Sequence, residues 1–412
     1  MPLFLLFLAL IAFSPFTQAN PAFARQTGMS CAACHAAFPK LNAFGQQFLA
    51  DNIRLPDWRE RMTLDTGDPQ LALPRQVPLA IRAQSYVQAR SARAQDDQGR
   101  TLAAPRLDFQ APYLIKILSG APLSDHISYY FYAILAEKGA NGETVVEDAW
   151  IAHDDVLGSG WGLTLGQFQI SDLMFPRETR LTFQDFLAYR MSGITYDRGA
   201  LLSGTLGPLS LDLGMTNGNG IDANAKINSG GYARPDRAFD NGTFKSLFAR
   251  LGTGSDWNGV NAGVFGLFGR QPGADGRGNG DKWIVGLDLS GQRGDLYWFA
   301  QLLDNHWQDF FHQGRDNRWW GGFIGLDWIR SERRSYSLLY NYADAGDFKN
   351  SATLYQGIAV NSLTLTASHY FMRNVKGIIE VNVDFLAADG RVDGIGHDTR
   401  EHYLLTGFDL AF

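Results

Sequence analysis

From about Val77 to the C-terminus, apolar and polar residues alternate in short segments with a period of two. Successive side chains of a β-strand point to opposite faces, so this pattern predicts strands with one apolar and one polar face. The clearest segments begin at Leu79, Ile127, Trp283, Leu296, Trp320, Tyr336 and Val375. Weaker segments lie near 107–117, 145–151, 161–169, 194–202, 209–217, 244–251, 260–268, 363–369 and 402–412. Together they predict about sixteen strands.

An even number of strands suits a closed antiparallel barrel, although a soluble β-sandwich shows the same alternation. The strands are about ten residues long and aromatic residues gather near their ends, as at the two interfaces of a membrane. In the segment from Val375, the residues Lys376, Glu380 and Asp384 take the parity opposite to the apolar positions, which suits a polar lumen. We therefore expect an all-β fold, a transmembrane barrel over residues 77–412 surrounded by lipid.

The last segment ends on Phe412, and Phe408 and Leu410 share its parity. This arrangement resembles the C-terminal signature by which bacterial outer-membrane proteins are recognised for barrel insertion. It indicates the bacterial outer membrane as the location.

Composition agrees with this fold and limits the partners. Aromatic residues make up 13% of the chain, there are 45 glycines and only 19% of residues are charged, which suits short strands joined by turns. The formal net charge of −6 disfavours nucleic acid as a partner.

The N-terminus carries an apolar run from Leu3 to Phe13, too short to span a bilayer but typical of the core of a signal peptide. Small residues predict a signal peptide over 1–19, ending at Ala19, with Ala24 as an alternative end. After this run no segment approaches the roughly 18 unbroken apolar residues of a spanning helix. The mature protein is therefore expected to be exported, and any membrane insertion must use strands.

Both cysteines of the chain lie in Cys31-Ala32-Ala33-Cys34-His35, the C-x-x-C-H pattern of c-type haem attachment. Two thiols at this spacing reach the two vinyl groups of one porphyrin, and the adjacent imidazole lies beneath the iron. The motif predicts one covalent haem c, attached through Cys31 and Cys34, with His35 as the proximal iron ligand.

Three other interpretations account for a pair of cysteines. A zinc site needs four Cys or His ligands, and the nearest other histidine is His126. A thioredoxin-like redox pair needs a βαβ surrounding that this stretch lacks. A disulfide explains the cysteines of an exported protein but leaves His35 unexplained.

The segment 20–64 is predicted to be the haem-binding part, and 65–76, which contains Asp65-Thr66-Gly67-Asp68-Pro69, the linker to the barrel. Apolar residues at helical spacings indicate a short helical face: Phe38, Leu41, Phe44, Phe48 and Leu49. Isolated domains below about 40 residues seldom hold a core, so something else must cover the porphyrin. The lumen of the barrel is the obvious candidate.

For the distal iron ligand, Met62 is favoured over Met29, because Met29 lies so close before Cys31 that its tether to the opposite haem face is short. The other histidines are remote in sequence: His126, His153, His306, His312, His369, His397 and His402. Each of these more often satisfies a loop or lumen network than ligates iron.

The segments Asn217–Asp240 and Asp304–Arg318 are predicted to be long external loops. The second contains residue types that bind metals: His306, Asp309, His312 and Asp316. Such residues in loops are more often merely solvated.

The stretch from Phe23 to Cys34-His35, followed by Phe38-Pro39-Lys40-Leu41-Asn42-Ala43-Phe44-Gly45 and Phe48, resembles the fused cytochrome–porins of the outer membrane, which include the iron oxidases of iron-oxidising bacteria. The resemblance implies haem attachment at Cys31 and Cys34 and ligation by His35. It departs at Gln46 and at Asn52-Ile53, where the family often has a basic residue and Gly-Tyr. The resemblance does not fix iron as the electron donor, which stays open.

Two functions follow from these patterns. In the first, an Fe(II)-oxidising oxidoreductase passes electrons from an extracellular donor through a single haem to a periplasmic cytochrome c or similar carrier. In the second, a porin passes small solutes and the haem segment is a plug or a sensor. No catalytic Ser-His-Asp order or paired-carboxylate signature favours a hydrolase.

Overall fold

The computed structural model describes residues 22–58, 63–91, 94–95, 101–103, 106–137, 145–176, 179–218, 244–253, 260–273, 277–344, 346–348, 359–385 and 402–412. The predicted signal peptide and Met62 lie outside these residues. Within them, no helix combines the length and apolar character needed to cross a bilayer.

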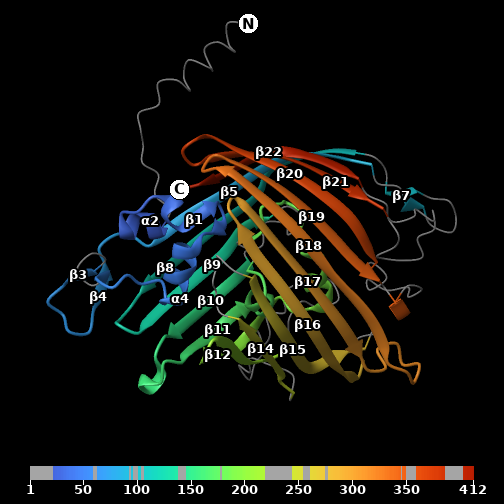
Figure 1. Cartoon of the computed structure of the whole chain (residues 1–412), viewed down its shortest axis with the longest axis horizontal. Coiled ribbons are helices and arrows are strands. Elements are labelled where there is room, and N and C mark those ends of the chain that lie inside the picture. Colours follow the sequence, from blue (N-terminus) through green and yellow to red (C-terminus); the bar gives the residue numbers. More distant parts are fainter. Residues whose placement is uncertain are drawn as a thin grey trace, which may run out of the picture.

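The described strands form one closed antiparallel barrel of sixteen members (Figure 1), which confirms the predicted fold class. In order around the barrel they are β5 (Leu79–Arg90), β8 (Arg106–Pro122), β9 (Ile127–Glu137), β10 (Val145–His153), β11 (Gly162–Gln169), β12 (Tyr196–Leu206), β13 (Leu209–Thr216), β14 (Ser246–Thr253), β15 (Val260–Pro272), β16 (Asn279–Arg293), β17 (Leu296–Trp307), β18 (Asn317–Ser331), β19 (Arg334–Asp344), β20 (Val360–Met372), β21 (Val375–Asp384) and β22 (Tyr403–Ala411). Pairing of β22 with β5, with Thr406 opposite Val87, closes the ring.

The alternation of each strand sorts its side chains between two surfaces. On β16 Val285 and Leu287 are about half exposed on the outer surface, whereas Ile284 and Asp288 are buried on the inner one. On β21 the predicted lumen residues are buried, and Glu380 is fully inaccessible. An apolar outer belt around a partly polar interior is the arrangement that a bilayer requires.

The two ends of the barrel differ in the length of their connections. At the end that carries the C-terminus, hereafter the terminal end, strands are joined by short turns such as 294–295, 332–333 and 373–374. At the opposite, loop end, the connections are longer and include 170–195, 217–245 and 385–402. The predicted loop Asn217–Asp240 lies largely outside the described residues.

The predicted external loop Asp304–Arg318 is shorter than expected. The ladder between β17 and β18 continues to the pair Trp307 and Asn317, so only 308–316 connects the strands. The prediction was too long because Asp304 and His306 are polar although they belong to β17. Both lie on the outer face of this strand, which extends past the apolar belt.

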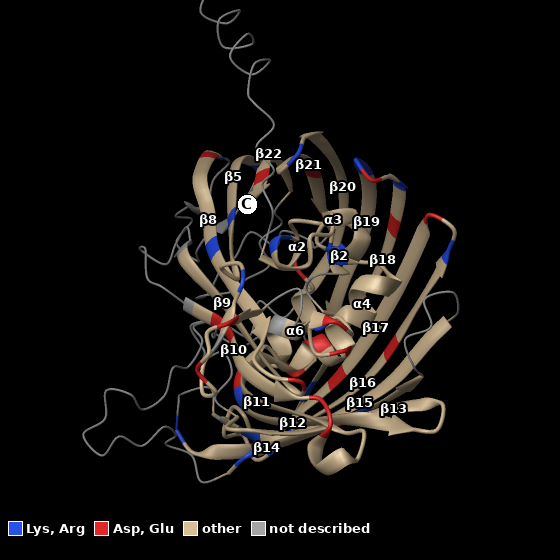
Figure 2. Ribbon diagram, turned by 90° about the vertical axis from the view of Figure 1, so that its left-hand side faces the viewer, with Lys and Arg blue, Asp and Glu red and all other residues tan. Residues whose placement is uncertain are grey.

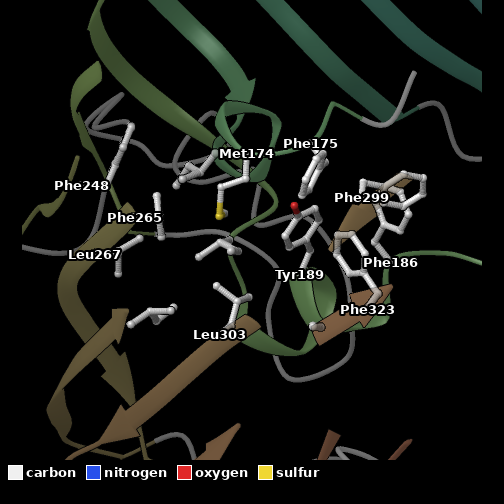
Figure 3. Packing of buried hydrophobic residues seen from close by; sticks show 14 of the residues in the cluster. Met174, Phe175, Phe186, Tyr189, Phe248, Phe265, Leu267, Phe299, Leu303 and Phe323 are labelled. Atoms are coloured by element: carbon white, nitrogen blue, oxygen red, sulfur yellow. The ribbon is translucent and has the colours of Figure 1, made fainter. Parts of the chain in front are cut away.

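Residues 170–195, here called the inner loop, fold back into the lumen instead of extending from the barrel. They contain η2 (Ile170–Leu173) and α6 (Leu187–Ser192). Figure 3 shows Met174, Phe175 and Phe186 of this loop meeting side chains of the wall. The rings of Phe186 and Phe323 stack with centroids 4.2 Å apart. The buried wall residues of this core come from β11 and from β14 to β19: Phe168, Phe248, Phe265, Leu267, Ile284, Phe299, Leu303, Phe323 and Leu339.

Polar contacts also fix the inner loop. The backbone nitrogens of Phe183 and Gln184 donate to the carboxylate of Glu380 at 2.5 and 2.9 Å. The side chain of Asn341 donates to the carbonyl of Asp185 at 3.0 Å. Glu380, which the sequence pattern placed in a polar lumen, therefore binds a segment of the chain itself.

The N-terminal residues 22–58, here called the plug, lie inside the ring of strands at the terminal end (Figure 2). They contain α2 (Ala22–Thr27), α3 (Cys31–Cys34), β1 (His35–Ala37), β2 (Lys40–Leu41) and α4 (Ala43–Ala50). The side chain of Gln26 donates to the carbonyl of Gly120 on β8 at 2.9 Å. Lys40 lies 2.8 Å from Asp327 on β18. The plug is thus bonded to opposite sides of the wall.

Short elements complete the described chain. A small hairpin of β3 (Thr63–Asp65) and β4 (Ala72–Pro74) spans the end of the predicted haem-binding segment and the predicted linker. The remaining elements are β6 (Ala94–Gln95), β7 (Thr101–Ala103), η1 (Val156–Gly158) and η4 (Gly346–Phe348).

Candidate functional site

The C-x-x-C-H motif forms one turn of helix followed by a short strand. Cys31 and Cys34 begin and end α3, and residues three positions apart lie on the same face of a helix. His35 follows in an extended conformation and opens β1. Both cysteines are free thiols, so the structure does not contain the disulfide considered above.

The neighbouring helix α4 holds this turn in place. Asn42 accepts from the backbone nitrogen of Gly45 at 2.9 Å and so caps α4, while its amide donates to the carbonyl of Ala33 at 3.0 Å. A Cβ atom on Gly45 would overlap the carbonyl oxygen of Cys34. A glycine is therefore required where α4 passes the motif. This close packing explains the glycine of the Phe44-Gly45 pair.

His35 is oriented by the chain that follows it. Its Nδ1 bonds to the carbonyl of Pro39 at 2.9 Å, and its ring lies edge-on to Phe38 with centroids 5.2 Å apart. A carbonyl only accepts, so Nδ1 carries the proton and the lone pair is on Nε2. Metal-binding histidines commonly donate their other ring N–H to a carbonyl in this way.

A cavity of about 440 Å³ lies between the plug and the wall, and Cys31, Cys34 and His35 are among the residues that line it. The plug also contributes apolar side chains: Phe23, Met29, Leu41, Phe44, Phe48 and Leu49. Phe44 and Leu49 are 43% and 46% exposed although they are large and apolar. The size and lining are those of a site for a cofactor or a small molecule.

The barrel supplies the opposite side of the cavity. Tyr130 and Trp150 stack with centroids 5.4 Å apart, and both line it. Arg82 on β5 and Lys116 on β8 bring charge to the same surface. These wall residues could not be recognised as part of a site in the sequence, because each lies at an ordinary lumen position of its own strand. Only the position of the plug shows that they line the cavity.

The electrostatics of the thiols differ from those of a reactive redox pair. Burial raises the pKa of Cys31, and burial together with the neighbouring Cys31 raises that of Cys34. Thioredoxin-like cysteines instead have lowered pKa values, because the thiolate is the nucleophile. This difference weakens the thioredoxin-like interpretation.

Of the two thioethers considered as distal ligand, Met29 lines the cavity. Met62 lies outside the described residues, so its role stays a prediction. Among the residues that the structure describes, His35 is the histidine that lines this cavity. His126 instead stacks on His153 and bonds to Asp154 at 2.7 Å.

The metal group considered for the segment Asp304–Arg318 does not assemble. His306 stacks on Trp283 and bonds to Asp304 at 3.2 Å. Asp309 accepts from the backbone nitrogen of Gly314 at 2.7 Å. Within the described part of the chain no cluster of three His, Cys, Asp or Glu residues is arranged to hold a metal ion. His306 belongs to β17, whereas Asp309, His312 and Asp316 lie in the connection 308–316.

No protein-family model and no curated protein matches the sequence. Solved structures do match the fold. The anion-selective porin from Comamonas acidovorans is 12% identical with a TM-score of 0.56, covering 82% of this chain and 99% of the porin. The outer membrane channel DcaP of Acinetobacter baumannii is 12% identical with a TM-score of 0.53, covering 81% and 97%. Salmonella typhi OmpF in complex with daunomycin is 9% identical with a TM-score of 0.52, again covering 81% and 97%.

These likenesses show the fold. The chain is a porin-like barrel of the bacterial outer membrane. In bacterial outer-membrane barrels the periplasmic turns are short and the extracellular loops longer, so we expect the terminal end with the plug to face the periplasm.

Proposed function

We propose that this protein is an outer-membrane c-type cytochrome, in which a porin-like barrel holds one covalent haem and electrons pass from an extracellular donor, Fe(II), to a periplasmic carrier such as a cytochrome c. The observation that supports it is the shared cavity, which brings Cys31, Cys34 and His35 of the plug against the wall of the barrel.

The residues present fit a porphyrin. The cavity has a volume of about 440 Å³, and its lining is largely apolar and aromatic. The two thiols lie on one turn of helix, and the hydrogen bond from His35 to Pro39 leaves the metal-binding lone pair on Nε2. Covering Phe44 and Leu49 would remove exposed apolar surface.

A haem bound here would supply one-electron oxidation and reduction at its iron. Cys31 and Cys34 would hold it by thioether bonds, and His35 would be the proximal ligand. Pro39 sets the orientation of the imidazole, because its carbonyl accepts the Nδ1 proton. Tyr130 and Trp150 would cover the haem from the side of the wall.

Location in the outer membrane suits Fe(II) as the donor. Oxidised iron is poorly soluble, and a barrel that exchanges only electrons keeps this product outside the cell. The terminal end opens towards the periplasm, and Cys31 is exposed there. A soluble carrier can therefore approach the motif from the periplasmic side.

The second candidate is a porin that passes small solutes, with the plug as stopper or sensor. The fold comparisons by themselves favour it, since the neighbours named above are porins or channels. The inner loop and the plug both occupy the lumen and are bonded to the wall, as between Lys40 and Asp327, so in this candidate the plug has to move before solutes pass.

Two measurements on the purified protein separate the candidates. A pyridine haemochrome assay should find one covalent haem per chain, and none in Cys31→Ala/Cys34→Ala. Single-channel recording should find low conductance. A chain without covalent haem and with large conductance would contradict the cytochrome and favour the porin.

A further inference from the structure

A group of buried polar side chains, here called the polar patch, lies on the inner wall near the loop end. Lys282 on β16 stands opposite Trp307 on β17, which stands opposite Asn317 on β18. In the next row Asn305 on β17 stands opposite Trp319 on β18. Lys282 is 8% exposed and the other four are 2% exposed or less. The register therefore brings five residues of three strands together, out of contact with solvent.

Several polar atoms of the patch have no bond. Within the described part of the chain, the amide oxygens and nitrogens of Asn305 and Asn317 and the Nε1 of Trp319 have no hydrogen-bond partner. Another asparagine of the wall differs, since Asn341 on β19 both donates to the backbone of the inner loop and accepts from it. Buried polar groups in proteins are nearly always bonded, so a cluster without partners points to a missing ligand.

Lys282 adds a positive charge to the patch. Its Nζ donates to the carbonyl of Ser192, the last residue of α6, and lies 5.2 Å from the ring centroid of Trp307. Among the residues that the structure describes, no carboxylate lies at ion-pair distance from this Nζ. Asp197 on β12 acts on it from farther away, and that carboxylate already accepts from two backbone nitrogens at 2.7 and 2.8 Å. Lysines are seldom buried without such a pair.

The short helix α6 covers the patch from inside the lumen, and Figure 2 shows it within the ring of strands. Its residues Leu187 and Met191 pack against the apolar cluster that contains Trp307 and Trp319. These apolar side chains cannot bond to the amides behind them. The carbonyl of Ser192 is the polar group of α6 that bonds to Lys282.

We propose that the polar patch is a binding site for a small inorganic anion such as chloride, and that α6 is its cover. The ammonium group of Lys282, the two asparagine amides and Nε1 of Trp319 can all donate hydrogen bonds to one anion. A monovalent anion also compensates the charge of Lys282, which a neutral solute does not do, whereas a cation is repelled. This inference holds whether or not the proposed function is correct.

The cover determines how the anion enters. In the structure the carbonyl of Ser192 is the partner of Lys282, so the anion binds when α6 has moved off the wall and takes the place of this carbonyl. A ligand favours the conformation that binds it better. The anion should therefore favour the lifted position of α6 at the loop end.

The test measures the melting temperature of the full-length protein in mildly acidic buffer, while chloride replaces gluconate at constant ionic strength. Constant ionic strength separates binding from screening. The melting temperature of the wild type should rise along a saturating curve, because a ligand of the folded state stabilises it. Lys282→Met should need at least about tenfold more chloride for the same rise, because a charged donor is lost. Lys245→Met, which removes a loop-end lysine bonded to Asn217, is the control and should behave like the wild type.

A second variant keeps the test decisive if Lys282→Met does not fold. Asn305→Leu/Asn317→Leu removes the unbonded amides at similar side-chain size, so it should be more stable than the wild type in gluconate and yet lose the rise with chloride. In crystals of the wild type soaked in bromide, anomalous scattering should place the ion beside Nζ of Lys282. A melting temperature of the wild type that chloride does not change overturns the assignment. An equal chloride dependence in the wild type and either variant of the patch overturns it as well.

Discussion

Lys40 of the plug donates to Asp327 on β18 at 2.8 Å and to the carbonyl of Thr179 in the inner loop at 3.2 Å. Both charged side chains are almost completely buried. One ammonium group therefore joins the three parts of the molecule, namely the segment with the C-x-x-C-H motif, the inner loop and the wall.

Replacement of Lys40 by Met should loosen all three parts. It leaves the carboxylate of Asp327 buried without its cation, which costs about 3–5 kcal/mol. We expect faster proteolysis of the plug and a lower melting temperature. Lys40→Met/Asp327→Asn is the control, since it removes both charges and should recover most of the stability. Equal stability of the two variants would show that the ion pair does not anchor the plug.

Replacement of Gly45 by Ala tests the contact between α4 and the motif. The added methyl group meets the carbonyl of Cys34, so α4 must move away, at a cost of about 1–3 kcal/mol. The fraction of purified chains with covalent haem should fall. Gly266→Ala is the control, because a Cβ there has open space around it, and it should leave the haem content unchanged. Unchanged haem content in Gly45→Ala would mean that the close approach is not needed.

Glu380 tests whether the inner loop closes the lumen. Besides the two backbone bonds from Phe183 and Gln184, it accepts from the hydroxyl groups of Thr366 and Tyr403, both at 2.7 Å. Glu380→Ala leaves these donors without their acceptor, so the loop should detach more often and single-channel conductance should rise. Glu380→Gln keeps one acceptor oxygen and should have a smaller effect. A conductance that neither variant alters would show that the loop stays in place through its apolar core alone.

The thiols of the haem-free chain should react slowly at neutral pH. Cys31 is exposed in part, but the surrounding protein still removes enough water to raise its pKa and that of Cys34. The reactive thiolates are therefore scarce below that pKa and accumulate only in the alkaline range. Alkylation by iodoacetamide, followed by mass spectrometry, should therefore lag behind that of an unstructured cysteine peptide and approach it as the pH rises. Faster alkylation than the peptide at neutral pH would instead indicate an activated dithiol.

The barrel could be predicted from the sequence, because the alternation of apolar and polar residues is visible within each strand by itself. The apolar residues Val285 and Leu287 predicted both the strand and the outer face on which the structure places them. The wall of the cavity was not predictable in this way. Arg82 and Lys116 become neighbours only through the register of β5 and β8, which depends on pairing between distant segments.

The inner loop was beyond a sequence prediction for a related reason. Its apolar residues, such as Phe175 and Phe186, predict that the loop packs against another part of the chain. The spacing of the apolar residues in the loop does not indicate which part that is. The partners are supplied by strands such as β17 and β18, far along the chain. The length of the loop between β17 and β18 was also predicted wrongly. Pairing of the two strands continues to Trp307 and Asn317, past the apolar residues by which the strands were recognised in the sequence.

Stopped-flow mixing of the purified protein with Fe(II), followed at the haem absorption band, tests the central claim most directly. The account predicts an oxidised haem spectrum that changes rapidly to the reduced one, at a rate that rises with the Fe(II) concentration. A chain without a haem band, or a haem that Fe(II) does not reduce, would contradict it.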